Sequence, residues 1–145
     1  MKWIYGKQDF KTLSRGQENC YLLTNGLGGF SSLTMTGSVT RNDHALLMAC
    51  TKAPNHRYNL IHRLKEEIRI GEEKQILSAQ EFADGTKEEG YQNLSTFSFE
   101  DTPVWRWETK GVRIRKELGM AQLENTVAVV YEMKNQSLFD AELVV

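Results

Sequence analysis

Apolar and polar residues alternate with a period of two along much of this chain, and that pattern constrains its fold more than any other feature. In residues 127–134, Val127, Val129, Tyr131 and Met133 fall on one side of an extended strand, and their neighbours fall on the other. A β-strand has this period because successive side chains point to opposite faces of a sheet. The pattern therefore predicts a structure made mainly of β-strands.

Three consecutive segments near the C-terminus fit an antiparallel meander. The alternation predicts strands over residues 104–108, 112–120 and 127–134, with a hairpin turn at residues 109–111. Short strands separated by turn signals every 8–12 residues or so are typical of a β-sandwich. We therefore predict an all-β fold, an antiparallel β-sandwich with at most one short helix.

The middle of the chain gives weaker signals. Residues 58–70 fit both strand and a helix of about three turns, and we favour strand because Gly71 begins a turn before a second apolar stretch. Residues 81–100 are largely polar. We predict a long loop there, with one short strand at residues 96–99.

The composition is that of an ordinary globular domain, with 40% hydrophobic and 26% charged residues among 145. Lys and Arg number 18 and Asp and Glu 19, which leaves a formal net charge of -1. We therefore expect neither nucleic acid nor a membrane as a partner. The N-terminus lacks the apolar segment of a signal peptide, and no apolar run is long enough to span a membrane. These features predict a cytoplasmic protein.

A glycine-rich turn between two apolar runs is not explained by core packing. Gly26, Gly28 and Gly29 fall within four positions, which indicates positive φ angles or a close approach of another group. Their spacing matches no dinucleotide or phosphate motif. We interpret the turn as one whose exposed Asn25 amide faces a neighbouring domain or a sugar, and a purely structural hairpin is the alternative.

A basic loop with a histidine follows, at Arg41, Asp43 and His44. These side chains can donate and accept hydrogen bonds to sugar hydroxyls, or they can form a network that holds one strand end. His56 and His62 complete the histidines, and none has the spacing of a zinc site. We predict no metal and no other cofactor.

Two tryptophans, Trp105 and Trp107, share one face of a predicted strand. Amphipathic rings of this kind can stack on the apolar faces of sugars, so the pair is a candidate platform, with core or domain-interface packing as the alternative. Cys20 and Cys50 lack metal-site spacing, and we interpret both as buried reduced thiols.

Glycoside hydrolysis requires two carboxyl groups on either side of the scissile bond. The acidic pairs at residues 66–67, 72–73 and 88–89 lie in charge-rich stretches, which we expect to be solvated. We therefore assign no catalytic residue to this chain.

Several motifs resemble, in order and spacing, the N-terminal domain of bacterial and archaeal glycogen debranching enzymes, the amylo-α-1,6-glucosidases. The most specific is the Asn-Gly-Leu-Gly-Gly block at residues 25–29, followed by Arg41 and His44. Weaker matches follow at Gly90, Tyr91, Leu94, Phe97, Pro103, Trp105, Gly111, Met120 and residues 125–127. The family usually has Arg-Tyr at the place of residues 42–43 and glycine at that of Ala45, so this chain departs from it there.

The resemblance covers about residues 19–145 and implies a β-sandwich of the galactose-mutarotase-like super-sandwich type. It also implies a downstream (α/α)6 barrel that carries the catalytic acids and hydrolyses α-1,6-glucosidic branches in glycogen-like α-glucan. This domain would pack on that catalytic domain and lend loop residues to the cleft. Residues 141–145 form a strand without a closing turn, so we expect residues 1–145 to be one domain of a longer polypeptide.

Two other functions are weighed against this one. The first is a stand-alone carbohydrate-binding or protein-interaction sandwich, and the second is a small independent enzyme. If the domain is separated from a barrel, we expect it to expose apolar surface and to self-associate.

Overall fold

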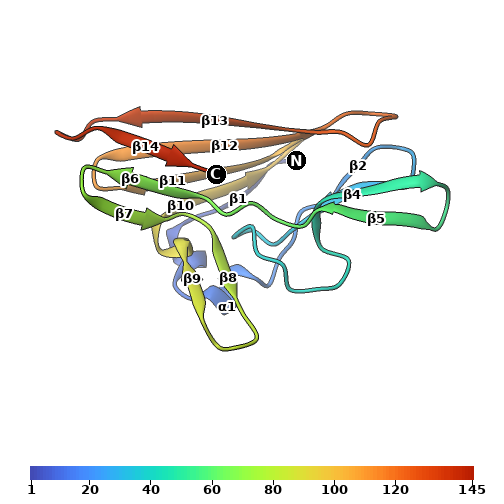
Figure 1. Cartoon of the computed structure of the whole chain (residues 1–145), viewed down its shortest axis with the longest axis horizontal. Helices are drawn as coiled ribbons and strands as arrows, with labels where there is room; N and C mark the ends of the chain where they lie inside the picture. Colours follow the sequence, from blue (N-terminus) through green and yellow to red (C-terminus); the bar gives the residue numbers. More distant parts are fainter.

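The computed structural model describes residues 1–145 and consists mainly of antiparallel strands (Figure 1). The largest sheet has five strands, in the order β1-β10-β11-β12-β13. These strands are β1 (Trp3–Tyr5), β10 (Leu94–Phe99), β11 (Pro103–Thr109), β12 (Val112–Met120) and β13 (Val127–Asn135). The last three form the predicted meander, and Lys110 and Gly111 make the turn between β11 and β12 with φ angles of 47° and 82°.

Three smaller sheets complete the fold. One has the order β14-β6-β7, from β6 (Glu67–Ile70), β7 (Glu73–Ile76) and β14 (Ala141–Val144). Another has the order β2-β3-β4-β5, from β2 (Leu23–Thr24), β3 (Phe30–Ser32), β4 (Ala45–Lys52) and β5 (His56–Ile61). The third pairs β8 (Ala79–Glu81) with β9 (Lys87–Glu89). In Figure 1 the β4–β5 hairpin extends to the right of the large sheet.

The helical segments are short. They are two 3-10 helices, η1 (Lys7–Phe10) and η2 (Gly90–Asn93), and one α-helix, α1 (Leu13–Gly16). Thr12 caps α1, because its hydroxyl accepts a hydrogen bond from the Arg15 backbone N–H at 3.1 Å. The prediction of an all-β sandwich with one short helix is confirmed. No helix in the structure combines the length and the apolarity needed to cross a membrane.

The core lies between the large sheet and the smaller ones. Trp105 and Ile114 from the large sheet are buried in the same cluster as Ile68 from β6 and Leu46 from β4. On β12 the apolar residues of one face are buried and the arginines between them are not, as the period-two pattern requires. Burial of that one face holds the sheets together.

The prediction of a long loop over residues 81–100 is wrong. This stretch contains the last residue of β8 and the whole of β9, η2 and β10. The short strand predicted at residues 96–99 is part of β10. The Asp84–Gly85 turn signal was real, since Asp84 Oδ1 accepts hydrogen bonds from the backbone and the hydroxyl of Thr86 at 2.9 and 2.7 Å. The strands could not be recognised from the sequence, because some of their buried residues are polar. Such residues are buried only because they bind partners elsewhere in the chain.

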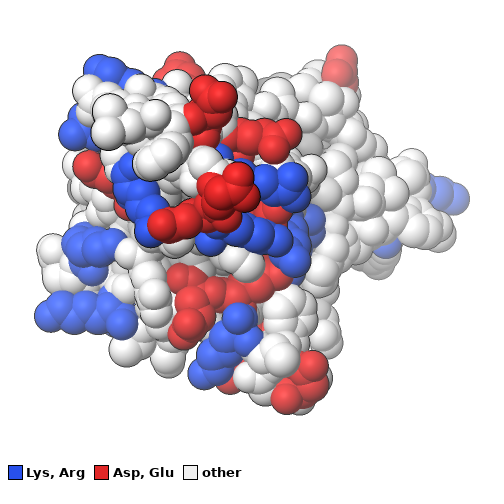
Figure 2. All heavy atoms as spheres, turned by 60° about the vertical axis from the view of Figure 1, so that its left-hand side comes forward, with Lys and Arg blue, Asp and Glu red and all other residues white.

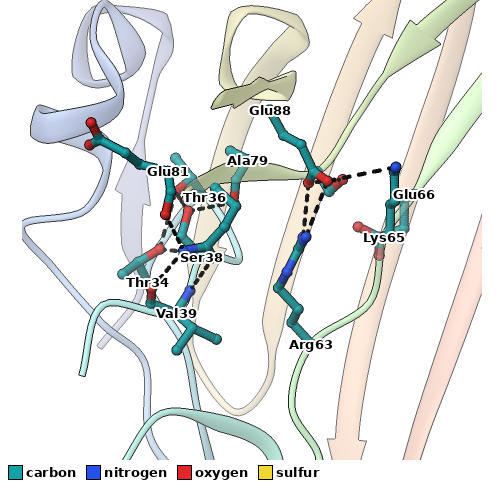
Figure 3. A network of polar contacts seen from close by, with 12 residues as sticks. Thr34, Thr36, Ser38, Val39, Arg63, Lys65, Glu66, Ala79, Glu81 and Glu88 are labelled. Carbon is teal, nitrogen blue, oxygen red and sulfur yellow. Dashed lines mark hydrogen bonds and ion pairs between the residues drawn. The ribbon is translucent and has the colours of Figure 1, made fainter. Parts of the chain in front are cut away.

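One such partner is Arg63, which binds Glu88 of β9 through two hydrogen bonds of 2.9 and 3.1 Å (Figure 3). Ser78 donates a further hydrogen bond to Glu88 at 2.9 Å. Figure 3 also shows the hydroxyls of Thr34, Thr36 and Ser38 in a chain that ends on the carbonyl of Ala79, 2.7 Å from Ser38 Oγ. These contacts attach β8 and β9 to the rest of the fold.

The expectation that residues 66–67 and 88–89 are solvated is wrong for three of the four. Glu66, Glu67 and Glu88 are buried. Glu66 pairs with Lys116 Nζ and accepts a 2.6 Å hydrogen bond from the Tyr131 hydroxyl. Both Lys116 and Glu66 have side chains only 4% exposed. A buried carboxylate keeps its charge only with such partners, and the sequence pattern gives no sign of them.

Candidate functional site

The Asn-Gly-Leu-Gly-Gly turn joins β2 to β3, and its centre is the side chain of Asn25. Asn25 is completely buried, so the expectation of an exposed amide is wrong. Its Oδ1 accepts hydrogen bonds from the backbone N–H groups of Leu27 and Gly29 at 2.9 and 3.0 Å. The amide therefore closes the loop from inside, in the manner of an Asx turn.

The same amide ties the loop to the turn between β12 and β13. Asn25 Nδ2 donates to the carbonyl of Glu124 at 2.9 Å and to Asn125 Oδ1 at 3.0 Å. Asn125 in turn bridges the backbone of Cys50 on β4, with its Oδ1 3.1 Å from Cys50 N and its Nδ2 3.0 Å from Cys50 O. Three segments distant in sequence thus meet at two amide side chains.

The glycines of this turn satisfy two different requirements. Gly26 and Gly28 have φ angles of 79° and 90°, which side chains rarely adopt. Gly29 is needed for space, because a Cβ there would lie 2.7 Å from Asn25 Nδ2 and 2.9 Å from Asn125 Oδ1. Gly26 and Gly28 are exposed, whereas Gly29 is buried.

The loop from Thr40 to His44 is closed by a histidine in a similar way. His44 is buried, and its Nδ1 accepts a hydrogen bond from Thr40 N at 3.0 Å. That acceptor role places the ring proton on Nε2, which lies 3.4 Å from Cys20 Sγ. His44 therefore holds the loop and does not point a side chain into solvent. Arg41 and Asp43 are the exposed members of the predicted set.

Acidification is expected to destabilise this loop. Burial lowers the pKa of His44; nearby Asp43 opposes that shift and Arg41 adds to it. The unfolded chain therefore binds the proton more readily than the folded chain does. The contribution of neutral His44 to the free energy of unfolding is complete above the ordinary histidine pKa of about 6.5 and declines as the pH falls below it. Free energies of unfolding measured from pH 7.5 to 5 should fall less steeply for His44→Gln than for the unmodified chain. His56→Gln, at an exposed position, is the control, and equal slopes for all three proteins would contradict the prediction.

The cysteine interpretation is correct for one residue only. Both thiols are free, but Cys50 is buried whereas Cys20 is exposed. Partial burial raises the pKa of the Cys20 thiol, with Arg41 opposing and Asp43 adding to the shift. Since His44 Nε2 carries a proton, it cannot accept one from Cys20. The pair is not arranged as a nucleophile and its base.

The two loops border one open groove, which we call the loop groove. It has a volume of about 560 Å³, and its lining includes Gly26, Gly28, Gly29, Asp43 and Arg57. Arg57 donates from Nε to the carbonyl of Gly28 at 2.9 Å, and its guanidinium lies 5.7 Å from the centre of the Phe30 ring. Arg41 lines a separate hollow, which it shares with Thr40, His62 and Gln80.

The tryptophans lie elsewhere. Trp105 and Trp107 are 1% and 3% exposed, and the indole of Trp105 donates to the carbonyl of Met35 at 2.8 Å. The structure thus shows core packing for both rings and leaves no stacking platform there. Of the predicted residues, the groove brings together the three glycines and Asp43, with Asn25 and His44 buried as supports.

Arg57 and Asn125 are the groove and loop residues that the sequence analysis did not select as site candidates. Arg57 is on β5, in a stretch with no distinctive motif, and register places it opposite Cys50. Asn125 belongs to the weak matches near the C-terminus, and no feature of the sequence connects it to Asn25. Only the fold brings these residues together.

The fold and the site define a β-sandwich domain with a glycine turn beside an open groove, and comparison with known families identifies the family. Residues 19–144 match the family described as "Glycogen debranching enzyme N terminal". The chain belongs to this family, as the turn at residues 25–29 indicated. No curated protein and no solved structure matches the chain.

Proposed function

We propose that this chain is the non-catalytic N-terminal domain of an α-1,6-glucosidase that debranches glycogen-like α-glucan. In that role it packs on the catalytic domain of the same polypeptide, and the loop groove forms an edge of the glucan cleft. The observation that carries the proposal is that the two predicted loops converge on one groove. Within it Asp43 and Arg57 form no ion pair, and Arg57 uses only its Nε in a hydrogen bond, to the Gly28 carbonyl. The Asp43 carboxylate and the two terminal nitrogens of Arg57 are therefore free for a ligand.

The charges of the groove differ from those on another side of the molecule. Figure 2 shows basic and acidic side chains interleaved there, without a patch of one sign. Many charged side chains of the molecule bind each other, as Lys110 does with Glu73 and Arg69 with Glu142. Charges that are paired in this way are poorly available to a ligand. An unpaired carboxylate and an unpaired guanidinium are suited to accept from and donate to the hydroxyls of a neutral sugar.

The carboxyl groups support a non-catalytic role. The loop groove has Asp43 as its single acidic residue, whereas glycoside hydrolysis uses two. Among the buried acids, burial alone would raise the pKa of Glu88, but hydrogen bonds from Arg63 and Ser78 outweigh this and hold the pKa below its ordinary value. Glu88 therefore stays ionised and has no proton to donate.

Packing on a second domain is supported by the exposed apolar side chains of β5. This strand is at the edge of its sheet, and Tyr58 and Leu60 are 54% and 61% exposed. An exposed edge strand with apolar residues is a surface that proteins normally cover.

Calorimetric titration with maltoheptaose and with a branched α-glucan tests the role of the groove. We expect Asp43→Asn and Arg57→Met each to weaken binding by about threefold to tenfold, because each removes hydrogen bonds made by a charged group. Lys52→Met, at the exposed end of β4, is the matched control and should bind normally. Binding that neither substitution affects would refute a sugar contact in this groove, and no binding at all would leave packing as the remaining role.

A further inference from the structure

A second hollow, which we call the aromatic groove, lies next to the loop groove. It has a volume of about 450 Å³, and it shares the wall formed by Cys20, Tyr21 and Leu22 with the loop groove. Both volumes are within the range of roughly 300–1,000 Å³ that is common for ligand sites. The two hollows are therefore neighbours on the surface, with Cys20, Tyr21 and Leu22 between them.

The floor of the aromatic groove is the inner face of the large sheet at its β1 edge. Trp3 pairs with Phe99 and Tyr5 with Phe97 in the β1–β10 ladder, so these four rings share one face. Tyr5 and Phe97 have ring centres 6.3 Å apart. Phe97 is 2% exposed and fixed in the core, whereas Trp3 at the rim is 55% exposed. The groove therefore has a floor of buried aromatic rings and, at its rim, the exposed indole of Trp3.

The lining of this groove has no charged residue, and its polar members include Asn19 and the Tyr5 hydroxyl. A neutral ligand with an apolar face and hydrogen-bonding edges fits such a lining. The pyranose ring has both features. Charged phosphates or peptides would find no counter-ion among the residues that line this groove.

We propose that the aromatic groove, next to the loop groove, binds an α-1,4-linked glucan chain, with a glucosyl ring stacked on Trp3. This inference takes only the class of ligand, an α-glucan, from the proposed function. The location of the site follows from the geometry of the groove. β1 precedes residues 19–144, which match the family. The accessible indole is thus supplied by the part of this chain outside the match.

The tryptophans provide a specific probe of this site. The chain contains three, and Trp105 and Trp107 are 1% and 3% exposed. Quenching of the intrinsic fluorescence by acrylamide therefore reports mainly on Trp3. We expect saturating maltoheptaose to reduce this quenching. In calorimetry, Trp3→Ala should bind maltoheptaose about tenfold more weakly, whereas Trp3→Phe should keep most of the affinity because it retains a ring.

The control is Ile4→Ala on the same strand. Ile4 is 63% exposed, but it points to the opposite face of the sheet, so its removal should leave the affinity unchanged. Far-UV circular dichroism of each variant shows whether the fold is retained. If Trp3→Phe is as weak as Trp3→Ala although both are folded, stacking on residue 3 is refuted.

The outcomes also separate this inference from the proposed function. If Asp43→Asn weakens binding and Trp3→Ala does not, the aromatic groove is not a glucan site, although the proposed role of the loop groove stands. If Trp3→Ala alone weakens binding, the aromatic groove is confirmed without the loop groove. If Trp3 becomes protected as the protein concentration rises and maltoheptaose adds nothing, a second copy of the chain covers the groove and the inference is overturned.

Discussion

Replacement of Glu66 by glutamine is expected to lower the free energy of unfolding by about 3–5 kcal/mol, because removal of one partner leaves a buried charge uncompensated. The uncompensated group is Lys116, whose Nζ lies 4.8 Å from the centre of the Trp105 ring and pairs with Glu66. The Tyr131 hydroxyl also loses a carboxylate acceptor. Urea denaturation at pH 7, followed by fluorescence and circular dichroism, measures the change.

Two further variants decide whether the charge is responsible. Glu72→Gln removes a carboxylate from the exposed β6–β7 turn and should change the stability by less than about 0.5 kcal/mol. The double replacement Glu66→Leu with Lys116→Met removes both charges together and should recover most of the loss, since buried ion pairs are often matched by apolar residues. A Glu66→Gln variant as stable as the original chain would show that Lys116 has no need of this carboxylate.

Replacement of Asn25 by alanine is expected to lower the free energy of unfolding by about 3 kcal/mol, as buried groups lose their partners. The groups left without Asn25 are the N–H groups of Leu27 and Gly29, the Glu124 carbonyl and Asn125 Oδ1. Hydrogen exchange of the Leu27 and Gly29 amides should accelerate more than exchange in β12. Global unfolding by urea gives the size of the effect.

The matched control is Asn42→Ala, in the neighbouring loop and exposed. It should leave both the stability and the two amides unchanged. Asn25→Asp adds a finer test, since it keeps the acceptor for Leu27 and Gly29 but places a charge against the Glu124 carbonyl. If Asn25→Ala exchanges its Leu27 and Gly29 amides at the original rate, the amide does not hold the loop.

The strands that the sequence revealed are those with one face in the core and one in solvent. On β12, Val112, Ile114 and Leu118 are buried between exposed or half-exposed residues, so a simple period was enough. β9 could not be found in this way because its buried residue is Glu88, whose partner Arg63 lies 25 positions earlier. β1 has only three residues, too few to establish a period.

The candidate site was predictable to the extent that it depends on backbone conformation. Glycines with positive φ mark the turn at Gly26 and Gly28 without knowledge of the fold. Whether a side chain faces solvent depends on long-range packing. Asn25 and His44 are buried and hold the loops, which the sequence did not indicate. Arg57 lies in the groove because β5 pairs with β4, and no local motif indicates that pairing.

The contact between Asn25 and Asn125 joins residues 100 positions apart, and this separation has a consequence for folding. Contacts of such long range are slow to form, because a large loop of chain must be closed first. During synthesis from the N-terminus the glycine turn precedes the β12–β13 turn by about 100 residues, so the Nδ2 group of Asn25 has no partner until residues 124–125 have been added. The glycine turn is therefore completed only once the β12–β13 turn is in place. We expect the amides of Leu27 and Gly29 to gain protection no earlier than those of β12 in a refolding experiment followed by pulsed hydrogen exchange.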